Sequence, residues 1–152
     1  MRSCLLIFLA LIFSSAAVAG IQPPPPQYII DAEQALTAKA GENLMQVNSL
    51  LADDVTVFEN GKLMATGKEA SLKLLMPVMK NTSRQIIGYS GGSGNLLIVD
   101  TFDVVDRSNL PPNFFAEPEI ASRSSLYQFG DDHLIHFVQI SIAMNHWVTP
   151  QN

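Results

Sequence analysis

The spacing of the hydrophobic residues changes once along this chain, close to Asn81, and that change limits the architectures available to it. Before Asn81, apolar residues recur every three or four positions, which is typical of amphipathic helices. After it, they alternate with polar residues or form short runs rich in β-branched side chains, which is typical of strands. Helices followed by consecutive strands indicate an α+β fold, with N-terminal helices packed on a curved antiparallel sheet.

The first half of the chain predicts three helices. The first begins near Tyr28 and is interrupted at Gly41, and its apolar face consists of Ile29, Ala32, Leu36 and Ala40. The second covers residues 42–51 and ends before Asp53 and Asp54. The third has Thr66 as its expected N-cap, with Glu69 three residues later as in a capping box. Pro77 should kink or end this helix, because proline lacks the backbone donor.

The strands begin between the second and third helices. Residues 55–59 and 62–65 are expected to form a hairpin, because Asn60-Gly61 between them favours a type I′ turn. Four further strands are expected at residues 83–89, 96–105, 122–129 and 133–144. Residues 107–120 hold three prolines and are expected to be a long irregular connection.

The N-terminus has the features of a secretory signal peptide. Arg2 precedes an apolar run at residues 4–13, and Ala17 and Ala19 occupy the small-residue positions of a cleavage site. The run is shorter than the about 20 apolar residues that cross a bilayer. We expect a signal peptide at 1–19, a proline-rich leader at 20–27, one domain at 28–146 and a C-terminal tail at 147–152. The protein is then secreted or periplasmic, without a transmembrane segment after cleavage.

Composition excludes several kinds of function. The chain has 152 residues, a formal net charge of -5 and no basic run, which argues against nucleic-acid binding. Its one cysteine, Cys4, lies in the signal peptide, so the mature chain has no disulfide or thiol nucleophile. His133 and His136 would point to opposite faces of a strand, so we expect no metal site. We expect no cofactor either.

Several short motifs resemble the SnoaL-like branch of the NTF2-like superfamily. The opening of that group is matched by Gly41-Glu42, by residues 50–57 (LLADDVTV) and by Gly67-Lys68-Glu69-Ala70, and its closing hairpin by residues 126–136 (LYQFGDDHLIH). The resemblance covers residues 28–144. It implies a cone-shaped α+β fold with one apolar pocket, often in a dimer. The superfamily includes steroid isomerases, polyketide cyclases, dehydratases and non-catalytic binding modules, so the resemblance alone selects no function.

Glu59 is the first catalytic candidate, and it comes from this resemblance. In the ketosteroid isomerases the base is a carboxylate five residues after the second Asp of the motif, and Glu59 stands five residues after Asp54. Those enzymes also need a Tyr donor on the first helix, and the matching position here is Gln34. That Tyr is half of the oxyanion site in those enzymes, and it is therefore missing here. The alternative for Glu59 is an exposed residue beside the hairpin turn.

Asp100 and His136 are further catalytic candidates. Asp100 alternates with Leu96, Ile98 and Phe102, and a lone acid on an apolar face is costly unless it is paired or protonated. It is either a pocket residue that donates a hydrogen bond as a neutral acid, or a solvated acid at a strand edge. His136 would share a face with Val138 and Ile140, as an acid/base group in the pocket or as a core or interface histidine.

The pocket should have apolar walls and a lid. We expect Phe58, Leu72, Met76 and Phe102 to line it, with Phe114 and Phe115 folding over its open end or packing in the core or at a dimer contact. Apolar residues on both faces of the last strand favour a homodimer through the outer sheet face. The function expected is an exported, non-catalytic module that binds a small apolar ligand or a partner. The alternative is an isomerase, cyclase or dehydratase that uses a pocket carboxylate.

Overall fold

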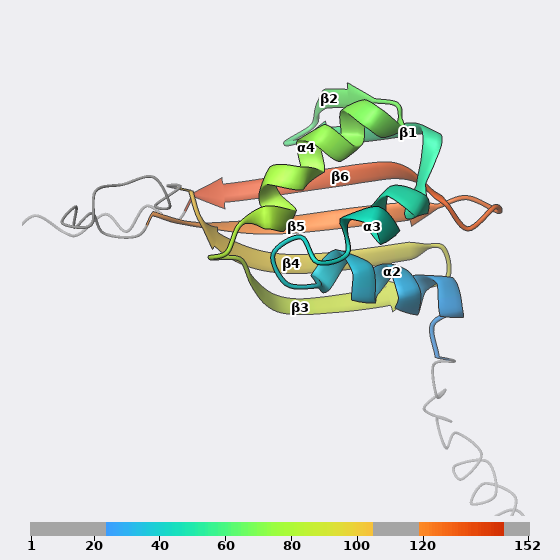
Figure 1. Cartoon of the computed structure of the whole chain (residues 1–152), viewed down its shortest axis with the longest axis horizontal. Helices are drawn as coiled ribbons and strands as arrows, with labels where there is room; N and C mark the ends of the chain where they lie inside the picture. Colours follow the sequence, from blue (N-terminus) through green and yellow to red (C-terminus); the bar gives the residue numbers. More distant parts are fainter. Residues whose placement is uncertain (1–23, 105–118, 145–152) are drawn as a thin grey trace, which may run out of the picture.

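The computed structural model describes residues 24–104 and 119–144, in which helices cover one face of a curved sheet (Figure 1). The helices are α2 (Gln27–Thr37), α3 (Leu44–Leu50) and α4 (Lys68–Lys80). The strands are β1 (Leu51–Glu59), β2 (Lys62–Thr66), β3 (Gln85–Gly92), β4 (Asn95–Asp103), β5 (Ile120–Phe129) and β6 (Ile135–Met144). The predicted α+β class, with N-terminal helices on a curved sheet, is confirmed.

The six strands lie in the order β2-β1-β6-β5-β4-β3, so β2 and β3 form the two edges. All neighbouring strands are antiparallel except β1 and β6, which are parallel. The sheet is therefore mixed, whereas the sequence predicted an antiparallel one. Periodicity identifies the buried face of a strand, but it contains no information on the direction of the neighbouring strand.

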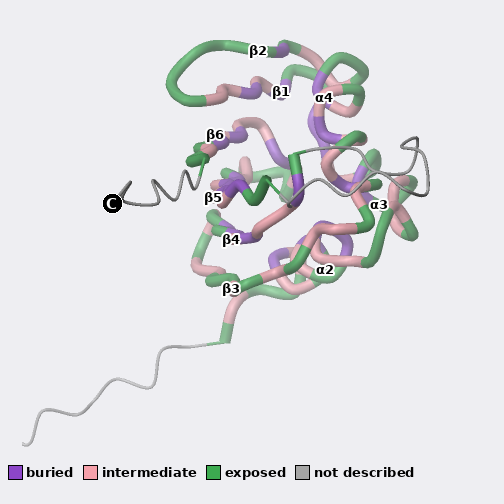
Figure 2. Tube along the Cα trace, turned by 90° about the vertical axis from the view of Figure 1, so that its left-hand side faces the viewer, coloured by how far each residue is buried: buried purple, intermediate pink, exposed green. Residues whose placement is uncertain are grey.

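The core lies between the concave face of the sheet and the helices, where the buried segments gather in Figure 2. α2 contacts β3 and β4, and α4 contacts β1 and β2. The concave face is apolar across most of its width, and its fully buried side chains include Val57, Leu96, Ile98 and Val138. Ile29 and Leu36 of α2 pack against this face.

Two helix boundaries differ from the predictions. α2 ends at Thr37, three residues before Ala40, because Ala38 already has an extended backbone. β1 begins at Leu51, so Asp53 and Asp54 lie within a strand and do not end a helix. Leu51 pairs with Ile135 of β6, and this tertiary contact overrides the local helical pattern.

The start of α4 also differs from the prediction. Thr66 is the last residue of β2, paired with Thr56, and the N-cap is Gly67 with a φ of 88°. Glu69 forms an ion pair with Lys73 at 3.0 Å in place of a capping box. α4 continues past Pro77 to Lys80. In the last turn, proline removes only one hydrogen bond of the helix, which does not end it.

The turns and bulges fix the registers of the strands. Asn60 and Gly61 both have positive φ, as the predicted type I′ turn requires. β3 continues to Gly92, so the next turn is shorter than expected. Extra residues form β-bulges at Ile87 in β3 and at His136 in β6, where the registers with β4 and β5 shift.

Several predictions lie outside the described residues. These are the signal peptide, most of the connection at 107–120 with Phe114 and Phe115, and the C-terminal tail. Among the described residues, no helix is both long and apolar enough to span a membrane.

Candidate functional site

Three buried charged side chains meet on the concave face of the sheet. Arg84 Nε donates a hydrogen bond to Asp100 Oδ2 at 2.7 Å, and Arg123 Nη2 donates to the same oxygen. The exposed fractions of the three side chains are 6% for Arg84, 2% for Asp100 and 4% for Arg123. We call these residues the Arg–Asp–Arg cluster.

Neighbouring strands hold two members of the cluster in place. Asp100 of β4 and Arg123 of β5 are direct partners in the register, so both side chains lie on the same face. Ile142 of β6 pairs with Arg123 from the other side. The Arg123 guanidinium also lies 5.5 Å from the ring centroid of Phe102, within the range of a cation–π contact.

The turn between α4 and β3 positions the third member, Arg84. Ser83 donates to Asn81 Oδ1 from both its backbone N–H and its hydroxyl, at 2.9 and 2.6 Å. The same turn is fastened to the end of β4, because the N–H of Asp103 donates to Ser83 Oγ at 2.8 Å and Asn81 Nδ2 donates to the Asp103 carbonyl. These contacts bring Arg84 alongside β4.

The cluster is not saturated by its own contacts. Among the described residues, Arg84 Nη1, Arg123 Nε and Asp100 Oδ1 are buried and have no hydrogen-bond partner. Buried polar groups are nearly always hydrogen-bonded, because leaving one unpaired costs about 1–3 kcal/mol. Three such atoms in a single contact group therefore require an explanation.

The surroundings of the cluster are shielded from water. Tyr127 lies two positions beyond Ser125 on the same face of β5, and burial raises the pKa of its phenol. The two arginines and Ser125 oppose this rise. Tyr127 is thus a neutral hydroxyl in a low-dielectric site, where charge interactions are stronger than in water.

Asp100 is the predicted site residue that the structure places in the cluster. It is neither a solvated acid at a strand edge nor an acid left alone on an apolar face. Sequence reasoning missed Arg84 and Arg123. One signal was available: Arg123 follows the same alternation as Ala121 and Ser125, and a buried acid calls for a cationic partner.

Glu59 and Phe58 are not near the cluster. Glu59 ends β1, where it pairs with Lys62 of β2 and Ile140 of β6, so one whole strand separates it from β5. Phe58 points to the opposite, outer face, where its ring lies 5.4 Å from that of Phe137. This placement results from the regular alternation of β1, in which Val57 takes the core position.

The remaining predicted lining residues are divided between the cluster and α4. Phe102 contacts the Arg123 guanidinium. Leu72 is partly buried and packs against the core, and Met76 is half-buried. The fully buried stripe of α4 consists of Ser71, Leu75 and Met79.

His136 does not line the concave face, contrary to the expectation. It is the extra residue of the β6 bulge, which places Ile135 in the core and leaves the histidine ring 36% exposed. Its Nδ1 lies 2.7 Å from Asp54 Oδ1, and its Nε2 lies 3.0 and 3.1 Å from the two Asp132 oxygens. Two ring nitrogens between two carboxylates favour the imidazolium form.

The stability that His136 provides should depend on pH. Its pKa is raised above the ordinary 6.5, chiefly by Asp132 and further by Asp54. This contribution is fully present below the unfolded-state value and is lost as pH rises through the folded pKa. The pKa of Asp132 is lowered below 3.8, chiefly by the backbone N–H of Leu134, so its own contribution is lost only as pH falls through that lowered value.

We therefore expect His136→Asn to lose more stability, relative to wild type, at pH 5.5 than at pH 9, in urea unfolding. His133→Asn is the control, because that ring stacks on Tyr28 with 4.3 Å between the centroids, and no ion pair joins it to Asp54 or Asp132 among the described residues. An equal loss at both pH values for His136→Asn would contradict the assignment.

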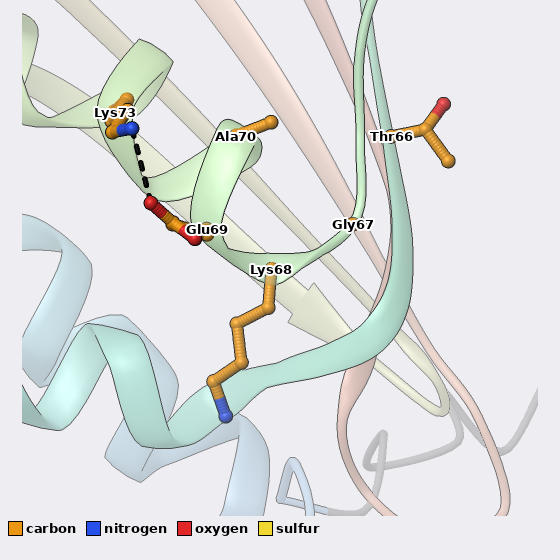
Figure 3. Close-up of a pocket in the computed structure, with 6 residues that line it drawn as sticks. All are labelled: Thr66, Gly67, Lys68, Glu69, Ala70 and Lys73. Atoms are coloured by element: carbon orange, nitrogen blue, oxygen red, sulfur yellow. Dashed lines mark ion pairs between the residues drawn. The ribbon is translucent and has the colours of Figure 1, made fainter.

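A hollow lies at the start of α4, but it is poorly suited to binding (Figure 3). It has a volume of about 480 Å³ and is lined by Thr66, Gly67, Lys68, Glu69, Ala70 and Lys73. Its charged side chains do not converge, because Glu69 is paired with Lys73 and Lys68 points away from both. The Arg–Asp–Arg cluster is therefore the stronger candidate site.

Comparisons with known proteins give a result for the fold only. No family model and no curated protein matches the chain. Among solved structures, a steroid delta-isomerase from Pseudomonas aeruginosa has a TM-score of 0.58 at 13% identity, covering 80% of this chain and 83% of that one. An LEH-like epoxide hydrolase from M. tuberculosis has 0.56 at 16% identity, covering 80% and 86%.

A third similar structure is an NTF2-like protein of unknown function from Cytophaga hutchinsonii. Its TM-score is 0.53 at 13% identity, and the match covers 77% of this chain and 95% of that one. At such identities the likeness concerns the backbone and not the activity. This chain has the NTF2-like fold that its sequence motifs resemble.

Proposed function

We propose that this protein is an exported module that binds a small, largely apolar molecule on the concave face of its sheet, without catalysing a reaction. The observation that carries the proposal is the group of partnerless polar atoms in the Arg–Asp–Arg cluster. Binding sites are typically apolar surfaces with a few convergent polar groups. The concave face has this composition, with Ile98, Ile140 and Ile142 beside the cluster.

The positions of the acidic and basic groups support a non-catalytic role. Acid/base catalysis needs a proton acceptor within hydrogen-bond reach of the substrate, usually with a second group beside it. The Oδ2 atom of Asp100 already accepts from two guanidinium groups. Glu59 and His136 lie elsewhere on the sheet, and Gln34, at the position of the isomerase Tyr, is exposed on α2.

Binding can be tested with the neutral fluorescent probe N-phenyl-1-naphthylamine. We expect saturable binding with one site per chain. Ile142→Trp should weaken it at least tenfold by placing a bulky ring beside Arg123, since Ile142 pairs with that residue. The control is Ser141→Trp, because Ser141 is exposed and alternation directs it to the outer face. Equal binding by the two variants would exclude the concave face as the site.

An isomerase-type enzyme is the second candidate. It is favoured by one observation, that Glu59 alternates with Val55 and Val57 and so belongs to the concave face of β1. If a turnover assay is established, Glu59→Gln should then reduce kcat by a factor of about 100 or more. If Glu59→Gln retains the full rate, Glu59 is not the catalytic base and only the binding role remains.

Export is the part of the proposal that concerns the N-terminus. The ordered positive, apolar and small-residue segments of residues 1–19 support it. Protein recovered from outside the cytoplasm of the native host should lack these residues, with Gly20 as its first residue. Intact-mass measurement checks this, and a full-length cytoplasmic species as the main form would contradict it.

We also propose a homodimer through the outer sheet face. Phe58 and Phe137 pack together there, and Leu97 is exposed. Apolar side chains on a face without covering helices are typical of an interface. Light scattering at micromolar concentration should give twice the chain mass, and Phe137→Lys should give the monomer. A monomeric wild type would contradict this proposal.

A further inference from the structure

The Arg–Asp–Arg cluster contains more positive than negative charge. Two guanidinium groups and one carboxylate give it a formal charge of +1. Each of the three side chains is more than nine-tenths buried. A buried charge without a partner costs several kcal/mol, so a cluster with one surplus cation calls for an anion.

The partnerless atoms indicate where such an anion would bind. Arg84 Nη1 and Arg123 Nε are both charged N–H donors with no acceptor among the described residues. Arg123 uses Nη2 for Asp100, while Nε, which completes the same planar fork, is free. A carboxylate fits guanidinium groups well, because its two oxygens accept parallel N–H bonds. The free Asp100 Oδ1 would accept a hydrogen bond from a hydroxyl group or water next to that carboxylate.

Among the described residues, the other groups near the cluster do not supply the missing charge. Asp103 is the nearest other acid on β4, and it lies three positions from Asp100, on the opposite face by alternation. Its Oδ1 accepts from the backbone N–H of Glu119 at 3.3 Å. Tyr127 is a neutral phenol, because burial raises its pKa.

We infer that the cluster binds the carboxylate of a small organic acid, whose apolar part lies against the isoleucines beside it. This inference rests on the proposed function and narrows its ligand from apolar molecules in general to apolar acids. The charge is recognised by Arg84 and Arg123. Asp100 fixes the positions of the two guanidinium groups, because both donate to one of its oxygens.

The experiment compares 2-naphthoate with 2-naphthamide, which have the same ring system and differ in charge, by titration calorimetry. We expect wild type to bind the acid at least about tenfold more tightly, since hydrogen bonds to charged groups are stronger than those between neutral groups. Arg123→Gln and Arg84→Gln should each reduce this preference to less than threefold. Lys73→Gln is the control, because it removes the same charge from an exposed side chain.

The outcomes separate the inference from the proposed function. If acid and amide bind equally, or if both arginine variants keep the preference, the inference is wrong while the binding function stands. If neither naphthalene compound nor the neutral probe binds, the proposed function fails as well. Stabilisation by chloride or phosphate without naphthoate binding would assign the cluster to an inorganic ion and overturn the inference.

Two further measurements keep the inference testable if a glutamine variant folds poorly. Melting followed by circular dichroism shows whether each glutamine variant is folded at the titration temperature. Arg123→Lys keeps the charge but loses the planar fork. It should retain part of the preference for the acid, and a loss equal to that in Arg123→Gln would show that charge does not govern recognition.

Discussion

Asp100→Asn is expected to lower the free energy of unfolding by about 3–5 kcal/mol, the range found when one partner of a buried ion pair is removed. Asn has the shape of Asp but no charge, so the variant leaves two buried guanidinium groups with no carboxylate between them. The buried charge rises from +1 to +2. Urea unfolding at neutral pH measures the loss, with the slope of the transition as a check on two-state behaviour.

Arg123→Met is the matched variant, because it changes the buried charge in the other direction. It leaves Arg84 and Asp100 as a neutral pair, and Met fills part of the space over Phe102. Its loss of stability should be less than half that of Asp100→Asn. Equal losses in the two variants would indicate that packing, and not charge balance, determines the stability of the cluster.

Gly91→Ala is expected to destabilise the protein by about 1–3 kcal/mol, the usual cost of overpacking a core. An added Cβ would lie 2.6 Å from Ile29 Cγ2, which is closer than carbon atoms can approach. Ile29 is fully buried, so it cannot move aside, and α2 would have to shift away from β3. Glycine at this position therefore sets how closely the first helix approaches the sheet.

Gly92→Ala provides the control for this prediction. A Cβ at Gly92 meets no atom within 4 Å, and the two glycines are adjacent in the same strand. We expect this variant to change stability by less than about 0.5 kcal/mol. If thermal melting shows equal effects for the two variants, close packing between α2 and β3 is not what Gly91 provides.

The sequence predicts the elements of the fold well where a single stretch contains the signal. The Asn60-Gly61 turn needs two positive φ angles, and its two residues adopt them readily. The start of β1 was mispredicted because Leu51 is drawn into the strand by Ile135, a residue far away in the sequence. The β6 bulge was missed because hydrophobic alternation does not reveal an extra residue, and His136 was then placed on the wrong face.

The candidate site shows the same limit. Asp100 could be identified because an acid on an apolar face is unusual within one strand. Its partners come from the turn after α4 and from β5, at sequence separations of 16 and 23 residues. Only strand register and the Asn81–Ser83 turn bring these side chains together. No local pattern could have predicted that the acid has two arginine partners.

The bulge at Ile87 also affects how the edge of the sheet meets other molecules. β3 is an edge strand, and a straight, regular edge can add a strand from another molecule and begin aggregation. The extra residue interrupts the spacing of backbone donors and acceptors and turns Ile87 outward, where it is 64% exposed. An incoming strand would lose register at this point. The bulge therefore protects the edge against intermolecular pairing, although an apolar residue occupies it.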